Sequence, residues 1–497
     1  MKKRLTAVIL LLSILGGTFV GCSENSGDTE SKETTNDNVV DASAESEEGV
    51  AEEETTLVTD GLPETDMNGY ELKILHHSQE WLSWAYNVLE AEETTGEALN
   101  DAIYKRRYDL QDRFNAVITT EPVVESNEAA VAEIVLTGDS TYSIVMMYDL
   151  RVTGALNYLN DMKELPYVSF DEAWWNPEAS AIFNIGGTQY AASGNYSLSV
   201  LSRAGGYAFN GDIITKLNLD SPYELVHNNQ WTIDNFYKLA DAANQDIDGD
   251  GQTTSSDQFG IEGSTKEHFL RMIFGSGVSI IKTGEDGYPS FALTNNELAV
   301  TKLQHIIDLS KNGGWLDTNS GGDLGAVNSV VAGSFDNGNC LFTVSNPTSL
   351  ANTRDLDFNV GFVPVPKYDE TQENYYSPAF GSEISVLPKT YDTSNAEYIG
   401  MLLEAMAFYT QQNIIPLYTE SVVKSKYARD AESSEMISIC FDSIYFDFGI
   451  NAWQEQAAAR LLNGSFVELK GNFGSVIKTM DKVVQSETKK LKKQIEG

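Results

Sequence analysis

The chain has 497 residues, with 73 Asp and Glu against 33 Lys and Arg, and a formal net charge of −40. This charge argues against nucleic acid or an anionic membrane surface as a partner, because both repel a polyanion. The chain is too long for one hydrophobic core, so we expect two folded domains. With only three cysteines, the fold does not depend on a disulfide framework, and we expect Cys340 and Cys440 to be buried free thiols.

Residues 1–21 have the pattern of a secretory signal peptide: a basic start, an apolar run over 5–15, and small residues before Cys22. The apolar run is shorter than the roughly 20 residues that span a bilayer. The Val-Gly-Cys end resembles a bacterial lipobox, in which the thiol is acylated, as with palmitate, and the peptide is cut before it. We therefore predict a lipoprotein anchored through Cys22 on the extracellular face of the cell membrane. The alternative is an ordinary signal peptide with an incidental cysteine.

Residues 22–67 are predicted to form a disordered acidic stalk. Between 23 and 66 there are 15 acidic residues, a single lysine and no aromatic residue. Such a segment buries too little apolar surface to offset the entropy of ordering, and its charges repel one another.

Strands and helices alternate after the stalk. We expect strands over 70–75, 117–120 and 142–147, and helices over 99–114 and 128–136. This order predicts a mostly parallel sheet with helices on its faces. Ligands of such sheets bind at the carboxyl ends of the strands, which here are the loops at 76–84 and 148–151.

A second series of elements begins near residue 200. We expect a helix over 231–244 with Thr232 as its N-cap. The other elements expected are helices over 297–309, 396–411, 450–462 and 473–490, and strands over 339–344 and 383–387. Two prolines exclude residues 363–366 from the interior of a central strand and favour a crossover.

An acidic loop follows the helix at 231–244. Its residues match positions 1, 3, 5, 7 and 12 of an EF-hand calcium loop: Asp246, Asp248, Asp250, Gln252 and Asp257. Gly251 would allow the sharp turn. We predict a structural Ca²⁺ site and no catalytic cofactor; the alternative is a solvated acidic turn.

Several segments, taken in their order along the chain, resemble those of one protein family. They are the lipobox, the stalk, YSIVMMYDLRVTGAL at 142–156, Trp231-Thr232, DIDGDGQTTSSDQFGI at 246–261, NGNCL at 337–341 and VPVPK at 363–367. Together they resemble the family 1 extracellular solute-binding proteins of ABC importers, the maltodextrin-binding protein group. One departure is Ser345-Asn346-Pro347, where the family often has Gly-Pro-Trp.

The resemblance implies an α/β fold of the type II periplasmic-binding-protein-like class. Two lobes would be joined by a multi-strand hinge: a first lobe over 68–193 and 366–412, and a second over 194–365 and 413–497. It further implies a monomeric, non-catalytic receptor. This receptor would capture a carbohydrate in the cleft, namely an oligosaccharide, and deliver it to the transmembrane subunits of a permease.

Sugar sites combine aromatic faces with polar groups that fix the hydroxyls. The ligand-binding candidates are Trp81, Trp84, Tyr148, Asp149, Arg151, Asn195, Tyr196, Asn346, Phe380, Glu383 and Trp453. For Trp453 the resemblance implies stacking on sugar. We assign Trp231 and Trp315 to the core and leave Trp174 and Trp175 open.

Two other functions stay open at this point. One is a receptor for a peptide or another polar solute. The other is a secreted penicillin-recognising serine hydrolase, because Ser421-Val422-Val423-Lys424, Ser193-Gly194-Asn195 and Lys282-Thr283-Gly284 match its three short motifs, though not in the usual order. His76-His77 has no further His or Cys at ligand spacing, so we do not expect a metal there.

Overall fold

The computed structural model describes residues 59–83, 85–86, 88–123, 127–251, 256–312, 315–317, 334–420, 431–466 and 471–496, which form one compact unit. Cys22, Trp84, Gln252 and the Ser421–Lys424 motif lie outside these residues, as do the side chains of 315–317. No helix within the described ranges combines the length and apolarity needed to cross a membrane.

The first lobe is built on a five-stranded sheet with the order β2-β1-β3-β15-β6. Its strands are β1 (Tyr70–His77), β2 (Ala116–Val123), β3 (Ile144–Tyr148), β6 (Ala191–Ala192) and β15 (Glu383–Val386). β1 pairs in parallel with β2 and β3, whereas β15 runs antiparallel to β3 and β6. The three predicted strands of residues 70–147 are confirmed, and the sheet is mixed because β15 returns from the second lobe.

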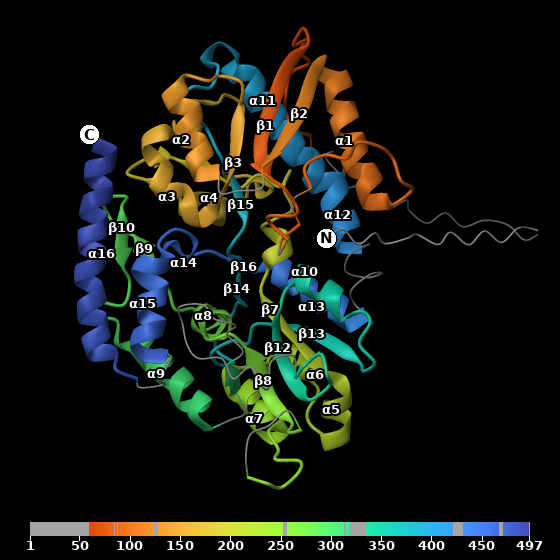
Figure 1. The fold of residues 1–497 in the computed structure, drawn as a ribbon, viewed down its shortest axis with the longest axis vertical. Helices are drawn as coiled ribbons and strands as arrows, with labels where there is room; N and C mark the ends of the chain where they lie inside the picture. The colour runs from red at the N-terminus through yellow and green to blue at the C-terminus, as the bar shows by residue number, and fades with distance from the viewer. Residues whose placement is uncertain are drawn as a thin grey trace, which may run out of the picture. The chain divides into compact units, whose positions relative to one another are not determined.

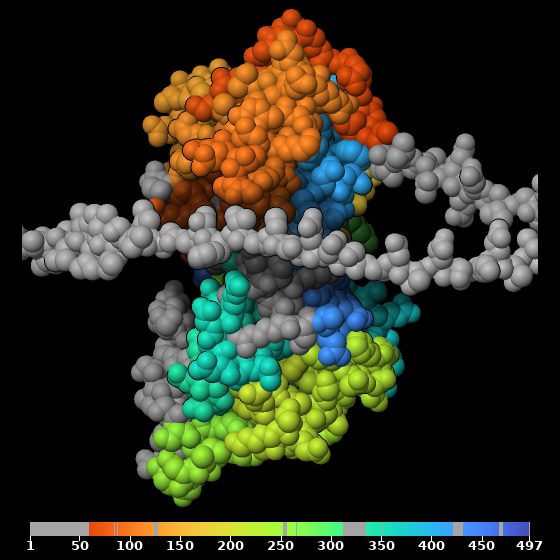
Figure 2. Space-filling model, turned by 90° about the vertical axis from the view of Figure 1, so that its right-hand side faces the viewer, coloured from red at the N-terminus to blue at the C-terminus, as the bar shows by residue number. Residues whose placement is uncertain are grey.

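Helices cover both faces of this sheet, as Figure 1 shows for its α1 and α2 sides. Leu72 and Ile74 of β1 share a core with α1 (Ala98–Phe114) and α11 (Ala396–Tyr409). Leu75, on the opposite face, packs with α2 (Asn127–Thr137) and α3 (Val152–Ala155). The alternation follows from the two-residue period of a strand. Figure 2 shows the orange surface of the α1 region adjoining blue residues from the α11 region.

The second lobe has a five-stranded sheet with the order β11-β8-β12-β7-β13. Its strands are β7 (Gly206–Asn210), β8 (Phe259–Gly263), β11 (Trp315–Asp317), β12 (Cys340–Ser345) and β13 (Val360–Pro364). β13 is an edge strand, so Pro364 sits where a missing N–H is tolerated. The exclusion of a central strand was therefore correct, but Val363 and Pro364 belong to a strand and not to the crossover.

The other elements are shorter or lie on the outside of the sheets. Two-residue and three-residue strands are β4 (Asn184–Ile185), β5 (Thr188–Gln189), β9 (Ile281–Thr283), β10 (Pro289–Phe291), β14 (Ser377–Pro378) and β16 (Ile444–Tyr445). The remaining helices are α4 (Pro177–Ala181), α5 (Gly211–Leu217), α6 (Pro222–His227), α7 (Ile233–Ala243), α8 (Thr265–Gly275), α9 (Glu297–Asn312), α10 (Pro347–Leu350), α12 (Ile415–Leu417), α13 (Ala431–Asp442), α14 (Phe448–Asn451), α15 (Ala459–Leu461) and α16 (Phe473–Glu496).

Helix α7 illustrates how local sequence places these elements. Thr232 caps it by accepting a hydrogen bond from the Asn235 backbone N–H at 3.4 Å, as predicted. Trp231 is fully buried, and its Nε1 donates to the Pro364 carbonyl at 2.7 Å. Its assignment to the core is therefore confirmed.

Two expectations about element boundaries were wrong. The folded unit begins at Thr59 and not at Asn68, because Met67 is buried and Asp60 pairs with Arg113 of α1. The helix expected over 450–462 is interrupted at Trp453, whose backbone angles (φ −118°, ψ 44°) are not helical. Every strand of each main sheet falls within the residues assigned to its lobe, while the lobe boundaries themselves stay predictions.

The two cysteines and the two undecided tryptophans are interior. Cys340 and Cys440 are both buried and free, as expected. Trp174 and Trp175 donate from Nε1 to the two carboxylate oxygens of Glu404, at 2.9 and 2.6 Å. These tryptophans therefore hold α11 against the rest of the first lobe.

Candidate functional site

An aromatic group lies at the carboxyl ends of two adjacent strands of the first lobe. Trp81 follows β1 and Tyr148 ends β3, and their rings meet edge to face with centroids 5.8 Å apart. Both side chains are only partly buried. Burial raises the pKa of the Tyr148 hydroxyl, so it stays protonated at neutral pH and can donate a hydrogen bond. This group can stack on an apolar ring face and bond to a polar edge.

Glu383 is buried and contacts His77, the residue on which Trp81 stacks. It is 1% exposed, and its Oε1 accepts a hydrogen bond from the His77 backbone N–H at 2.6 Å and lies 2.6 Å from His77 Nδ1. The imidazole of His77 stacks on Trp81. Glu383 was expected to bind ligand directly; in the structure it is buried and holds His77.

Asp149, next to Tyr148, is buried rather than open to a ligand. Its carboxylate accepts hydrogen bonds from the Asn451 side chain at 3.0 Å, from the Leu150 N–H at 2.8 Å and from the Gly381 N–H at 3.2 Å. Burial raises its pKa to about 6, against the lowering effect of these bonds. Because Asn451 belongs to the second-lobe segment 413–497, Asp149 ties the β3 loop to that segment.

Three other candidates also lie inside the protein. Asn195 and Tyr196 are 8% and 1% exposed; Asn195 accepts from the Asn176 side chain at 2.6 Å, and Tyr196 bonds through its hydroxyl to Ser385. Asn346, 3% exposed, accepts from the Ser349 backbone N–H at 3.0 Å and so begins α10. Their polar groups are engaged within the protein.

Trp453 is the clearest departure from the expectation that the resemblance raised. It is 4% exposed, and its ring packs edge to face on Phe448 with centroids 5.0 Å apart. In this conformation it is a core residue. Arg151, in contrast, is exposed and faces a groove.

This groove has a volume of about 260 Å³ and is lined by both lobes. The first lobe contributes Glu128, Leu150, Arg151, Thr153 and Gly154; the second contributes Ala452, Gln454, Glu455 and Gln456. It lies beside the Tyr148–Asp149 loop, where the fold predicts a ligand.

Sequence reasoning missed a cluster of charged residues beside Phe380. Arg203, Lys266 and Arg271 each lie within 6 Å of the Phe380 ring centroid, and Glu267 forms an ion pair with Arg271. Phe380 itself is 3% exposed, so the three cationic side chains pack around a buried ring. Only the Glu267–Arg271 spacing of four residues was visible in the sequence, since Arg203 comes from a separate turn, Leu201–Arg203.

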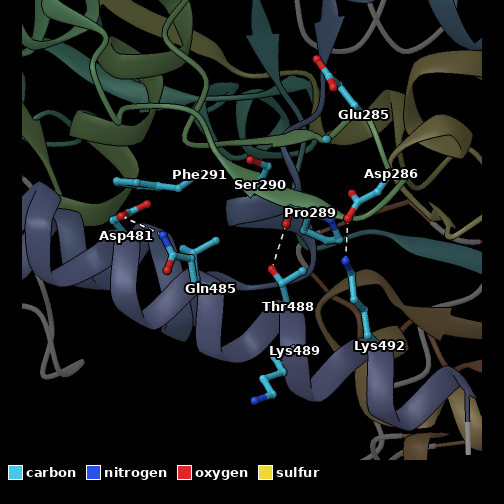
Figure 3. A pocket seen from close by; sticks show the side chains of 12 residues that line it. Glu285, Asp286, Pro289, Ser290, Phe291, Asp481, Gln485, Thr488, Lys489 and Lys492 are labelled. Atoms are coloured by element: carbon cyan, nitrogen blue, oxygen red, sulfur yellow. Dashed lines mark hydrogen bonds and ion pairs between the residues drawn. The ribbon is translucent and has the colours of Figure 1, made fainter.

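A larger cavity of about 660 Å³ lies in the second lobe alone (Figure 3). It lies between the β9–β10 hairpin and α16. Two contacts join these elements: Thr488 Oγ1 donates to the Pro289 carbonyl at 2.8 Å, and Lys492 pairs with Asp286 at 2.5 Å. Lys489 points away from the hairpin in this view. Because no first-lobe residue lines it, this cavity does not have the geometry of a site closed by two lobes.

The acidic loop brings together three carboxylates that could contribute to binding a hard cation. One carboxylate oxygen from each of Asp246, Asp248 and Asp250 lies within 4.8 Å of the others. Gly251 has φ +71°, which permits the turn, and Asp257 is 4% exposed. The pKa of Asp248 is raised: the hydrogen bond from the Asp250 N–H lowers it, but burial and three neighbouring aspartates outweigh that bond. The described residues fit Ca²⁺ chemistry.

The motifs of the serine-hydrolase alternative do not form one site among the described residues. Ser193 follows β6 in the first lobe and is 3% exposed, whereas Lys282 and Thr283 are exposed on β9 in the second. The Ser421–Lys424 motif is outside the described residues.

The fold has known counterparts, although no family model and no curated protein matches the sequence. A cyclo/maltodextrin-binding protein complexed with maltotetraose matches with a TM-score of 0.52 at 14% identity, over 86% of this chain and 97% of that chain. The cyclic alpha-maltosyl-1,6-maltose binding protein from Arthrobacter globiformis gives 0.51 at 13%, over 86% and 100%. UspC of M. tuberculosis gives 0.52 at 12%, over 84% and 99%. The fold is therefore the maltodextrin-binding-protein-like, type II periplasmic-binding-protein-like fold.

Proposed function

We propose that this protein is the lipid-anchored, extracellular substrate-binding component of an ABC importer, and that it captures a saccharide. The observation that carries this proposal is the Trp81–Tyr148 group at the carboxyl ends of β1 and β3, in a two-lobed fold shared with sugar receptors. Flat aromatic surfaces beside polar groups suit the alternating apolar faces and hydroxyl edges of sugar rings. The protein would carry out no catalysis.

The anchor and the permease are further parts of this proposal. The support for them is the lipobox-like end at Cys22 and the acidic segment that follows it. A lipidated receptor on a charged stalk stays close to the membrane while its lobes remain free to reach the transmembrane subunits. A structural Ca²⁺ ion at Asp246, Asp248 and Asp250 would hold the loop between α7 and β8.

A thermal-shift screen tests the proposal. Neutral and acidic oligosaccharides, short peptides and polyols are each added to the unlipidated globular part. A ligand at 100 times its Kd adds about 2.7 kcal/mol to the free energy of unfolding, which raises Tm measurably. We expect one or more saccharides to do so. Stabilisation by peptides with no response to any saccharide would overturn the sugar assignment.

A further inference from the structure

Three cationic side chains converge on one aromatic ring at the junction of the lobes. The Phe380 centroid lies 5.7 Å from Arg203 Cζ, 5.9 Å from Lys266 Nζ and 5.8 Å from Arg271 Cζ. Arg203 ends the turn Leu201–Arg203, which precedes β7, whereas Lys266 and Arg271 belong to α8 of the second lobe. A cationic cluster is unexpected in a chain with a net charge of −40.

The protein neutralises this cluster incompletely. Glu267 pairs with Arg271, whose Nε nevertheless has no hydrogen-bond partner among the described residues although the side chain is 2% exposed. Lys266 Nζ donates to the neutral Gln454 Oε1 at 2.7 Å, and no described carboxylate lies within 4 Å of it. Charges removed from water are costly unless paired, so the site favours an added anion.

Two further carboxylates act on the cluster from a greater distance. The charges of Glu455 and Asp149 raise the pKa of Lys266, but neither forms an ion pair with it within 4 Å among the described residues. Burial lowers the pKa of both Lys266 and Arg203, and the negative charge of Glu267 partly opposes this effect.

The cluster is accessible and adjoins the aromatic group. The Glu267 side chain is 28% exposed, and Arg203 and Lys266 are only partly buried. Gln454, which accepts from Lys266, lines the 260 Å³ groove between the lobes together with Arg151. Tyr148, which contacts Trp81, stands directly before the loop whose Leu150 and Arg151 line this same groove. A ring on Trp81 and a charged substituent at Lys266 can therefore belong to one ligand.

We propose that the ligand is an acidic saccharide, whose anionic group binds beside Lys266 and Arg203 while a sugar ring stacks on Trp81. The anionic group is assigned as the carboxylate of a uronic acid residue; a sulfate ester offers the same charge from another source. This inference rests on the proposed function, because it names the substrate class of the same site.

The test is calorimetry with matched ligands of one chain length. Xylo-oligosaccharides with and without a glucuronic acid branch, oligogalacturonides, and sulfated and neutral galacto-oligosaccharides are titrated at 50 and 300 mM NaCl. We expect a uronate-bearing ligand to bind at least tenfold more tightly than its neutral counterpart at low salt, and this advantage to shrink at high salt. Lys266→Gln should remove most of the advantage, so that the Kd values of the uronate-bearing ligand and its neutral counterpart become similar.

Control variants separate charge from folding. Lys266→Arg keeps the charge and should keep most of the preference. Lys282→Gln changes an exposed lysine on β9 and should behave as wild type. If Lys266→Gln fails to fold, the salt dependence of the wild type and the Lys266→Arg result still decide the question.

The outcomes are distinguishable. Neutral saccharides that bind as tightly as acidic ones would overturn the acidic ligand while leaving the proposed function intact. Binding of sulfated but not uronate ligands would support the anion site and overturn the carboxylate assignment. No binding of any saccharide would overturn both proposals.

Discussion

The indole of Trp81 lies flat on the imidazole of His77, with ring centroids 4.1 Å apart and planes inclined by 12°. His77 is held in turn by Glu383, which is 306 residues away in sequence and fully buried. The orientation of the partly exposed indole is therefore set by packing before any ligand arrives. Such preorganisation lowers the entropy cost of binding.

Trp81→Ala should weaken binding of the best saccharide by about 2 kcal/mol or more, as truncation of a central aromatic anchor does. Trp81→Phe keeps an aromatic face and should lose less. The folded structure should change little, because Trp81 is only partly buried. Calorimetry on both variants measures the effect; an unchanged Kd in Trp81→Ala would remove this residue from the site.

Trp453→Ala should act on stability instead. The residue is 4% exposed against Phe448, so the change should lower the free energy of unfolding by about 3–5 kcal/mol. Trp231→Ala, at a fully buried position, is the matched control and should cost a similar amount. Denaturant melts give both values. A Trp453→Ala protein with wild-type stability but weakened sugar binding would restore the stacking role that the family resemblance implied.

Asp149 should make stability depend on pH. Its pKa rises from 3.8 to about 6 on folding, so the folded protein holds the proton more tightly than the unfolded chain does. This contribution to stability is complete below pH 3.8 and is lost as the pH rises through 6. In urea melts, the deficit of Asp149→Asn relative to wild type should shrink by about 1 kcal/mol between pH 5 and pH 7. A deficit that is constant over this range would contradict the raised pKa.

Calcium should raise the Tm of the globular part, and EDTA should lower it. Asp248→Asn removes one charged ligand and should blunt both shifts. Asp241→Asn, an exposed aspartate on α7 outside the loop, is the control and should respond as wild type. Superimposable melting curves with calcium and with EDTA would identify the loop as a solvated turn.

Cys22→Ala should abolish lipid anchoring, because the thiol is the predicted acylation site. The full-length precursor is expressed in a host that processes lipoproteins, and Triton X-114 partitioning is followed by immunoblot. Wild type should enter the detergent phase and the variant the aqueous phase. Equal partitioning of the two would refute the lipobox interpretation.

Much of the fold follows from local sequence. Three features depend only on residues close together in the chain: the alternation in β1, the Thr232 cap of α7 and the proline of β13. For these features the local pattern of side chains is enough to predict the structure. The order of such elements along the chain, with the family resemblance, was enough to predict the two-lobed α/β fold.

The site depended on relationships that local patterns do not contain. Tyr196 and Trp453 are residue types that often bind sugars, yet both are buried: the Tyr196 hydroxyl bonds to Ser385, 189 residues away, and Trp453 packs on Phe448. Arg203 and Lys266 are 63 positions apart in the numbering and meet only through Phe380. Residue type and spacing thus determined the elements and their order along the chain. Only the tertiary structure decided which of the candidate side chains remain exposed, because burial is a property of long-range packing and not of the neighbouring residues.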